Sequence, residues 1–139
     1  MRKVPEEIEK LATKTIGAAI EVHKGLGPGF RETTYRQAME IELGLRKLPF
    51  QSECDINVNY KGNQLGAGRV DLLIDDLLLV ELKAVEKVLP VHRSQLIHYL
   101  KATKRPLGLL LNFNVVKMKQ GISRVVMTKN HPRAKWSKK

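Results

Sequence analysis

The segment from Leu77 to Ala84 constrains the fold most, because it joins the densest apolar run of the chain to two charged residues. The four residues from Leu77 to Val80 are typical of the interior of a β-sheet, and Glu81 and Lys83 follow at once. A charge in a sheet interior is costly unless it is paired or coordinated. Because side chains alternate along a strand, Glu81 and Lys83 share one face. The segment therefore predicts a buried strand that carries a polar site.

The preceding strand is predicted to bring a second acid to this site. Residues 64–74 and 78–84 have the composition of two strands around a turn, and Asp75 and Asp76 are turn formers. If the loop consists of residues 75–77, Asp71 lies directly across from Glu81. Cross-strand neighbours have Cβ atoms about 4.5–5.5 Å apart, so the two carboxylates would repel each other without a cation between them.

A hard divalent cation such as Mg²⁺ or Mn²⁺ resolves this conflict. Mg²⁺ uses one or two carboxylates and keeps positions for water and for a phosphate oxygen. That geometry suits phosphodiester hydrolysis, in which the ammonium of Lys83 can orient the attacking water and stabilise charge. The alternative is a surface ion pair between Glu81 and Lys83, which a Glu-x-Lys triplet alone would favour. The apolar setting and the aligned Asp71 favour the metal site.

The remaining chain predicts the element order ααβββαββ within one α/β domain over residues 1–127. Apolar spacing predicts helices over 6–24, from near 30 to about 47, and over 91–103. Strands are predicted over 50–60, with one wet face, and over 64–74, 78–84, 107–113 and 122–127. The basic residues 128–139 are expected to form a disordered tail.

Charge and composition narrow the partners. The net charge is +11, and the tail from Lys129 to Lys139 supplies five of those positive charges, so the rest of the chain keeps six. Such a field attracts polyanions, although many basic proteins are merely soluble. The first residues lack the apolar core of a signal peptide, and no apolar run is long enough to span a bilayer. With Cys54 as the single cysteine, we expect a cytoplasmic protein without disulfides or membrane association.

Two other kinds of site are disfavoured. The four histidines show no zinc-ligand spacing and have no cysteine partners, so satisfied or surface roles are expected (His23, His92, His98 and His131). The glycine-rich stretch from Gly25 to Gly29 lacks the Lys-Ser/Thr ending of a phosphate-binding P-loop and lies between two helices.

Several short motifs, in order, resemble those of the bacterial GxxExxY family within the PD-(D/E)XK nuclease superfamily. They are residues 29–35 (GFRETTY), 68–71 (GRVD), 80–86 (VELKAVE), 95–100 (QLIHYL) and 108–114 (GLLLNFN). The resemblance spans roughly residues 5–127. It implies a restriction-endonuclease-like core, with a central mixed β-sheet flanked by helices and a metal site on the hairpin.

The same resemblance implies a set of site residues. Asp71, Glu81 and the backbone carbonyl of Leu82 would bind the metal ion, Lys83 would be the catalytic lysine, and Glu32 would add a carboxylate to the metal site from the second helix. Tyr35 shares a helix face with Glu32 and could present its hydroxyl beside it. Glu32 could instead only compensate the helix dipole.

Gln95 and Tyr99 complete the catalytic residues that the resemblance implies. They share a helix face at i, i+4 spacing, where the amide could orient a ligand, a water or the scissile phosphate. A polar rim on a packed helix is the competing interpretation.

The leading functional hypothesis is a Mg²⁺- or Mn²⁺-dependent nuclease acting on nucleic acid, with DNA preferred as the substrate. The alternative is a catalytically inactive nuclease-fold module that binds nucleic acid or a protein partner. Clustered carboxylates facing a polyanion argue against the inactive module. A homodimer is also plausible, since double-strand cuts need two active sites.

Overall fold

A computed structural model describes residues 4–127, and its helices and strands follow the predicted order with one added 3-10 helix. The elements are α1 (Glu6–Leu26), α2 (Glu32–Leu45), β1 (Phe50–Tyr60), β2 (Asn63–Ile74), β3 (Leu78–Lys83), α3 (Pro90–Thr103), β4 (Leu107–Asn112), η1 (Met118–Gly121) and β5 (Ile122–Val126). The predicted tail lies outside the described residues. The predicted fold class, a mixed sheet flanked by helices, is confirmed.

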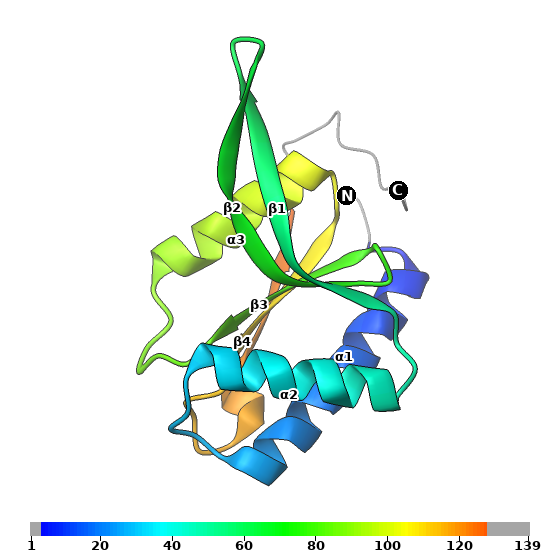
Figure 1. The fold of residues 1–139 in the computed structure, drawn as a ribbon, viewed down its shortest axis with the longest axis vertical. Helices are drawn as coiled ribbons and strands as arrows, with labels where there is room; N and C mark the ends of the chain where they lie inside the picture. The colour runs from blue at the N-terminus through cyan, green and yellow to red at the C-terminus, as the bar shows by residue number, and fades with distance from the viewer. Residues whose placement is uncertain (1–3, 128–139) are drawn as a thin grey trace.

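The five strands form one sheet in the order β1-β2-β3-β4-β5 (Figure 1). All neighbours are antiparallel except β3 and β4, which run parallel and are joined through α3. Helices α1 and α2 cover one face of the sheet, and α3 covers the other. The predicted turn is also confirmed, because Ile74 pairs with Leu78 around residues 75–77 and both Asp75 and Asp76 have positive φ.

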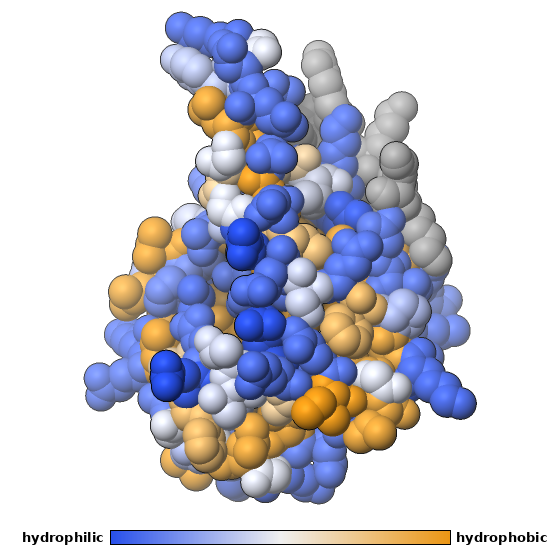
Figure 2. Space-filling model, viewed as in Figure 1, coloured by the Kyte–Doolittle hydropathy of each residue, from blue (hydrophilic) through white to orange (hydrophobic). Residues whose placement is uncertain are grey.

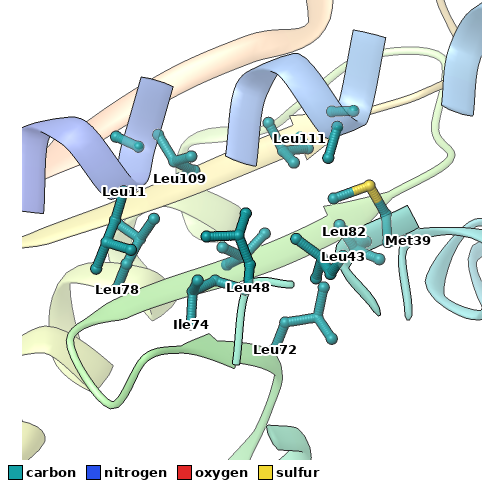
Figure 3. Close-up of a cluster of buried hydrophobic side chains, with 14 of the residues drawn as sticks. Leu11, Met39, Leu43, Leu48, Leu72, Ile74, Leu78, Leu82, Leu109 and Leu111 are labelled. Carbon is teal, nitrogen blue, oxygen red and sulfur yellow. The ribbon is translucent and has the colours of Figure 1, made fainter. Parts of the chain in front are cut away.

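The larger part of the core lies between the sheet and helices α1 and α2 (Figure 3). Leu78, Val80 and Leu82 of β3 point into it, whereas Leu79 packs on the α3 side. The alternation of a strand therefore places Glu81 on the α3 side of the sheet. Burial of a large aliphatic side chain contributes roughly 1.5–3 kcal/mol, so this packing fixes the register that carries the charged residues.

Strands β1 and β2 extend well beyond the other three strands, and we call their projecting residues 57–67 the arm (Figure 1). Its tip is a turn in which Lys61 and Gly62 have φ of 50° and 82°. The prediction that the strand over 50–60 has one wet face holds as far as Val58, which is half-buried between exposed neighbours, and fails at Tyr60, which is 58% exposed. The tip of the arm is mostly hydrophilic on the face that Figure 2 shows.

The ends of the first two helices differ from the prediction because of backbone conformation. Helix α1 continues to Leu26 and stops where Gly27 adopts a φ of 70°. Helix α2 begins only at Glu32, after Gly29 at φ 108°, and ends at Leu45, two residues before Lys47 takes a left-handed conformation. The 3-10 helix η1 was not predicted.

Candidate active site

The site lies at the junction where β2 separates from β3. Their backbone ladder ends at the pair Leu72 and Val80, one position before Asp71 and Glu81. There the side chains replace the ladder. The N–H of Asp71 donates to Glu81 Oε1 at 3.0 Å, and the N–H of Leu82 donates to Asp71 Oδ2 at 2.7 Å. The two acids are therefore brought together as the strand register predicted.

A distortion in β1 faces this junction. Ser52 pairs with Leu72 and Cys54 with Val70, so Glu53 stands opposite Asp71. Glu53 has a φ of 54°, which is uncommon for a residue other than glycine within a strand. The distortion lies where β2 separates from β3. On one side of this point β2 pairs with both β1 and β3, and on the other side it pairs with β1 alone.

Both carboxyl groups are held in surroundings that disfavour their charge. Burial, together with the charge of Asp71, raises the pKa of Glu81 to about 8. Glu81 is only 6% exposed. Burial also raises the pKa of Asp71, a shift that the hydrogen bond from Leu82 opposes and the charge of Glu32 increases. A positive charge beside these two acids would therefore stabilise their ionised forms.

Lys83 is the nearest cation to the pair. Its Nζ lies 4.0 Å from Glu81 Oε2, and its side chain is 16% exposed. Its charge lowers the pKa of both Asp71 and Glu81, but burial outweighs that effect. One ammonium beside two carboxylates leaves a net negative charge that a divalent cation would compensate.

Leu82 presents backbone atoms to the same place. Its N–H points to Asp71, and in a strand the N–H and C=O of one residue point to the same side. The carbonyl of Lys83 points the other way, since it accepts a hydrogen bond at 2.9 Å from the N–H of Phe113. The carbonyl of Leu82 is thus directed toward the gap between β2 and β3.

Glu32 lies at the first position of α2, is exposed, and is close enough for its charge to act on Asp71. Among residues 4–127, no three His, Cys, Asp or Glu side chains converge tightly enough to hold a metal ion. Glu32 is therefore near the acidic pair but does not complete a preformed cage with it, and its role as a ligand stays a prediction.

Tyr35 does not accompany Glu32, so that prediction is wrong. The Tyr35 ring is fully buried and stacks on Phe113 with centroids 4.5 Å apart. Its hydroxyl donates to the Gly27 carbonyl at 2.5 Å and accepts the N–H of Phe30 at 3.2 Å. The tyrosine thus fixes the loop before α2 and, through it, the start of the helix that carries Glu32.

Tyr99 of α3 reaches the junction from the other side of the sheet. Burial and then the charge of Glu81 raise the pKa of its hydroxyl, against a hydrogen bond from the backbone of Arg69. The hydroxyl lies against Gly68, where an added Cβ would overlap it. Gln95, one turn earlier on α3, is exposed and lines a groove together with Tyr99. The structure therefore places Tyr99 beside the acidic pair and Gln95 in the groove that Tyr99 also lines, and the catalytic roles of both stay predictions.

Asn112 is a residue whose position the sequence reasoning missed. It is buried, and its amide forms two bonds to one backbone unit: Oδ1 accepts the N–H of Val85 at 3.1 Å, and Nδ2 donates to the Val85 carbonyl at 2.9 Å. Asn112 also pairs with Lys83 in the parallel ladder. It therefore holds the chain directly after the lysine. A polar residue that ends an otherwise apolar strand was the available signal.

The chemistry of these groups fits a hard divalent cation. Asp71 and Glu81 each use one oxygen for a backbone N–H, which fixes the carboxylates and leaves their other oxygens for a ligand. Two carboxylates and one carbonyl match the small protein share of a Mg²⁺ shell, which is completed by water and phosphate. A softer metal finds no support, because His23 bonds to the Val115 carbonyl at 2.8 Å and His92 to the N–H of Leu89 at 3.0 Å.

Comparison with known proteins identifies related chains. The sequence matches the family model described as the PD-(D/E)XK nuclease superfamily over residues 9–125. The structure is similar to the crystal structure of SSO0001, with a TM-score of 0.53 and 21% identity, over 68% of this chain and 49% of that chain. The chain thus spans about half the length of that protein, and the likeness shows the fold. A search of curated proteins gave no match. No helix within residues 4–127 has the length and apolar character needed to cross a membrane.

Proposed function

Because this chain belongs to the PD-(D/E)XK nuclease superfamily, we propose that it hydrolyses phosphodiester bonds with a divalent metal ion bound by Asp71 and Glu81. The observation that carries the proposal is the reciprocal pair of hydrogen bonds at the end of the β2 and β3 ladder. These bonds hold two buried acids together at a place where their charge is unfavourable without a cation.

We assign the roles from the positions of the residues. Asp71, Glu81 and the carbonyl of Leu82 would hold the metal ion, and Glu32 would contribute a further carboxylate from the start of α2. When bound, Mg²⁺ or Mn²⁺ would supply a Lewis acid for the phosphoryl oxygen and lower the pKa of a bound water. Lys83, whose Nζ lies 4.0 Å from Glu81 Oε2, would orient the attacking water and stabilise negative charge in the transition state.

Gln95 and Tyr99 act on the substrate side of the same site. Tyr99 is 3% exposed and fixed between α3 and the backbone of β2, so its hydroxyl is a rigid donor for a phosphate oxygen. Gln95 is exposed at the groove surface, where its amide would orient the nucleotide or a water. Neither group requires ionisation for these roles.

We further propose DNA as the substrate, the cytoplasm as the location, and the bacterial GxxExxY group as the branch of the superfamily. The net charge of +11 supports a polyanionic substrate. A homodimer would place two active sites on one duplex, as a double-strand cut requires.

The test is cleavage of circular single-stranded DNA, linear duplex DNA and RNA in Mg²⁺, Mn²⁺ or EDTA, with Lys83→Ala and Asp71→Ala in parallel. We expect metal-dependent cutting by the wild type and loss of cutting in both variants, with unchanged circular dichroism. Attack on the circle would define an endonuclease. Full activity in either variant would contradict the mechanism, and binding without cutting in any metal would favour the inactive module.

A further inference from the structure

A groove runs between the arm and α3 and opens beside the candidate active site. Its volume is about 980 Å³. Residues from both elements line it. The polar ones are Asn57, Asn59 and Gln64 from the arm and Ser94, Gln95, His98, Tyr99 and Lys101 from α3, and the apolar ones are Val58, Ala67, Val91 and Ala102. The groove shares Gln95 and Tyr99 with the candidate site, and Tyr99 is the residue that the charges of Glu81 and Asp71 influence. A ligand in the groove would therefore continue directly to the carboxylates.

The lining combines polar and apolar side chains and carries little charge. Amide side chains dominate the arm wall, where Asn59 and Gln64 form a directly opposed pair in the strand register. Among the described residues that line the groove none is acidic, and the basic ones are His98 and Lys101. Helix α3 itself contains no Asp or Glu. The groove thus accepts an anionic ligand without being built mainly to neutralise phosphates.

We propose that this groove holds an unpaired nucleic-acid strand, so that the substrate of the proposed nuclease is single-stranded or has a single-stranded segment next to the cut. The inference rests on the proposed function, because it takes the acidic pair as the place of cleavage. It extends that function by assigning the arm and α3 as the surface that selects the substrate.

The chemistry of the lining favours unpaired bases over a duplex. Asn and Gln side chains offer a donor and an acceptor together, which match the edges of nucleobases. In a duplex the Watson–Crick edges are already paired, and up to two thirds of protein hydrogen bonds go to phosphate and sugar, mostly from cations and backbone. A groove with several amides and few charged groups fits exposed bases better. The exposed His98 adds a flat surface of the kind on which unpaired bases stack.

The dimensions of the groove agree with this choice. Its volume is at the upper end of the range of about 300–1,000 Å³ that is typical of small-molecule sites. That space accepts a few nucleotides of a single strand. On the β2 wall the small side chain of Ala67 leaves room for a ligand to approach the strand closely.

Fluorescence anisotropy of the full chain in EDTA tests this inference without requiring catalysis. The probes are a labelled single-stranded DNA of mixed sequence, the single-stranded RNA of the same sequence, and the duplex. The groove variant is Gln64→Glu with Ser94→Glu, which adds one negative charge to each wall. The matched control is Gln37→Glu with Gln51→Glu, which adds the same charge at two exposed positions outside the groove.

We expect the wild type to bind a single strand more tightly than the duplex. The groove variant should bind the single strand at least roughly tenfold more weakly, because like charges now face each other, and the control should stay within about twofold of the wild type. The DNA and RNA arms identify which sugar is preferred. Ala67→Leu, which fills the groove without adding charge, gives the same weakening if the double variant does not fold.

Tighter binding of the duplex, absence of single-strand binding, or equal single-strand binding by the groove variant and the control would overturn the inference. The proposed function fails separately. Groove-dependent binding of a single strand without cleavage in any metal would retain the groove and remove the nuclease. Cleavage that the groove variant leaves unchanged on single strands and duplex would retain the nuclease and remove the groove.

Discussion

The two halves of β2 are built for different purposes. Residues 70–74 are buried or half-buried, and 72–74 among them pair with both β1 and β3, whereas residues 63–69 are exposed and form backbone pairs with β1 alone. Asp71 lies where the first arrangement gives way to the second. One strand thus provides a rigid segment that fixes an acid and a free segment that forms one wall of a groove.

The difference shows how a buried acid pair can remain accessible. If β2 had continued beside β3, its backbone would have filled the space in front of Glu81 and Leu82. Because β2 departs, the backbone N–H groups of Asp71 and Leu82 are satisfied by carboxylates, and one side of the pair remains open to a ligand. The predictions below alter one half at a time.

Removing the charge of Glu81 should have the largest effect on activity. Glu81→Gln keeps an oxygen that can accept the N–H of Asp71 but loses a metal-binding carboxylate. We expect cleavage to fall by at least about 10²-fold to 10³-fold, as for the loss of one preorganised electrostatic group. Single-turnover cleavage across a Mg²⁺ titration measures it. Wild-type cleavage at low Mg²⁺ would show that Glu81 is not a ligand.

Loosening the chain after Lys83 should have the next largest effect. Asn112→Ala removes both bonds to Val85, so Lys83 is held less firmly, and activity should fall about 10-fold to 100-fold. Asn114→Ala is the control, because Asn114 bonds to Asn112 through its backbone.

A positioning role for Asn112 predicts a lower kcat with little change in the KM for nucleic acid. A lower melting temperature with an unchanged kcat would instead assign it to stability alone.

The boundary of the exposed half of β2 can be tested at Gly68. Gly68 has a φ of 142°, and an added Cβ would overlap the Tyr99 hydroxyl. We expect Gly68→Ala to lower the free energy of unfolding by about 1–3 kcal/mol and to reduce cleavage by displacing Tyr99. Gly66→Ala, in the same strand with open space at its Cβ, is the matched control. Urea unfolding and cleavage assays should show a larger loss of stability and activity for Gly68→Ala than for Gly66→Ala. Equal losses in the two variants would contradict the close approach of Gly68 to the Tyr99 hydroxyl.

The buried half of the comparison was predictable from the sequence, whereas the exposed half was not. The hydrophobic runs and the Asp75-Asp76 turn fixed the pairing of Ile74 with Leu78, and simple counting then placed Asp71 beside Glu81. Burial selects one register there because a slip of one residue would turn Leu72 and Val80 away from the core. Because burial allows a single register, the hydrophobic pattern of these two strands was enough to predict their pairing.

The arm offered no such constraint. Ile56, Val58 and Tyr60 alternate as if they faced a core, but Ile56 is the one of the three that is buried, whereas Val58 is half-buried and Tyr60 is exposed. The departure of β2 from β3 at Asp71 coincides with the left-handed conformation of Glu53, which local periodicity does not reveal. Tyr35 was misjudged for a related reason, since its spacing from Glu32 did not reveal that its ring stacks on Phe113.

The smallest expected effect is a pH dependence of stability that belongs to the buried half alone. Unfolded Glu81 loses its proton near its ordinary pKa of 4.5, whereas burial holds the folded pKa at about 8. The folded state therefore binds more protons between these pH values, so the stabilisation from Glu81 is complete below pH 4.5 and is lost as the pH rises through 8.

In EDTA the melting temperature of the wild type should fall over this pH interval by a few degrees more than that of Glu81→Gln. Mg²⁺, which binds the ionised pair, should raise the wild-type melting temperature more at pH 8 than at pH 6. Identical pH profiles for the two proteins in EDTA would show that Glu81 is ionised in the folded chain and that the junction needs no cation.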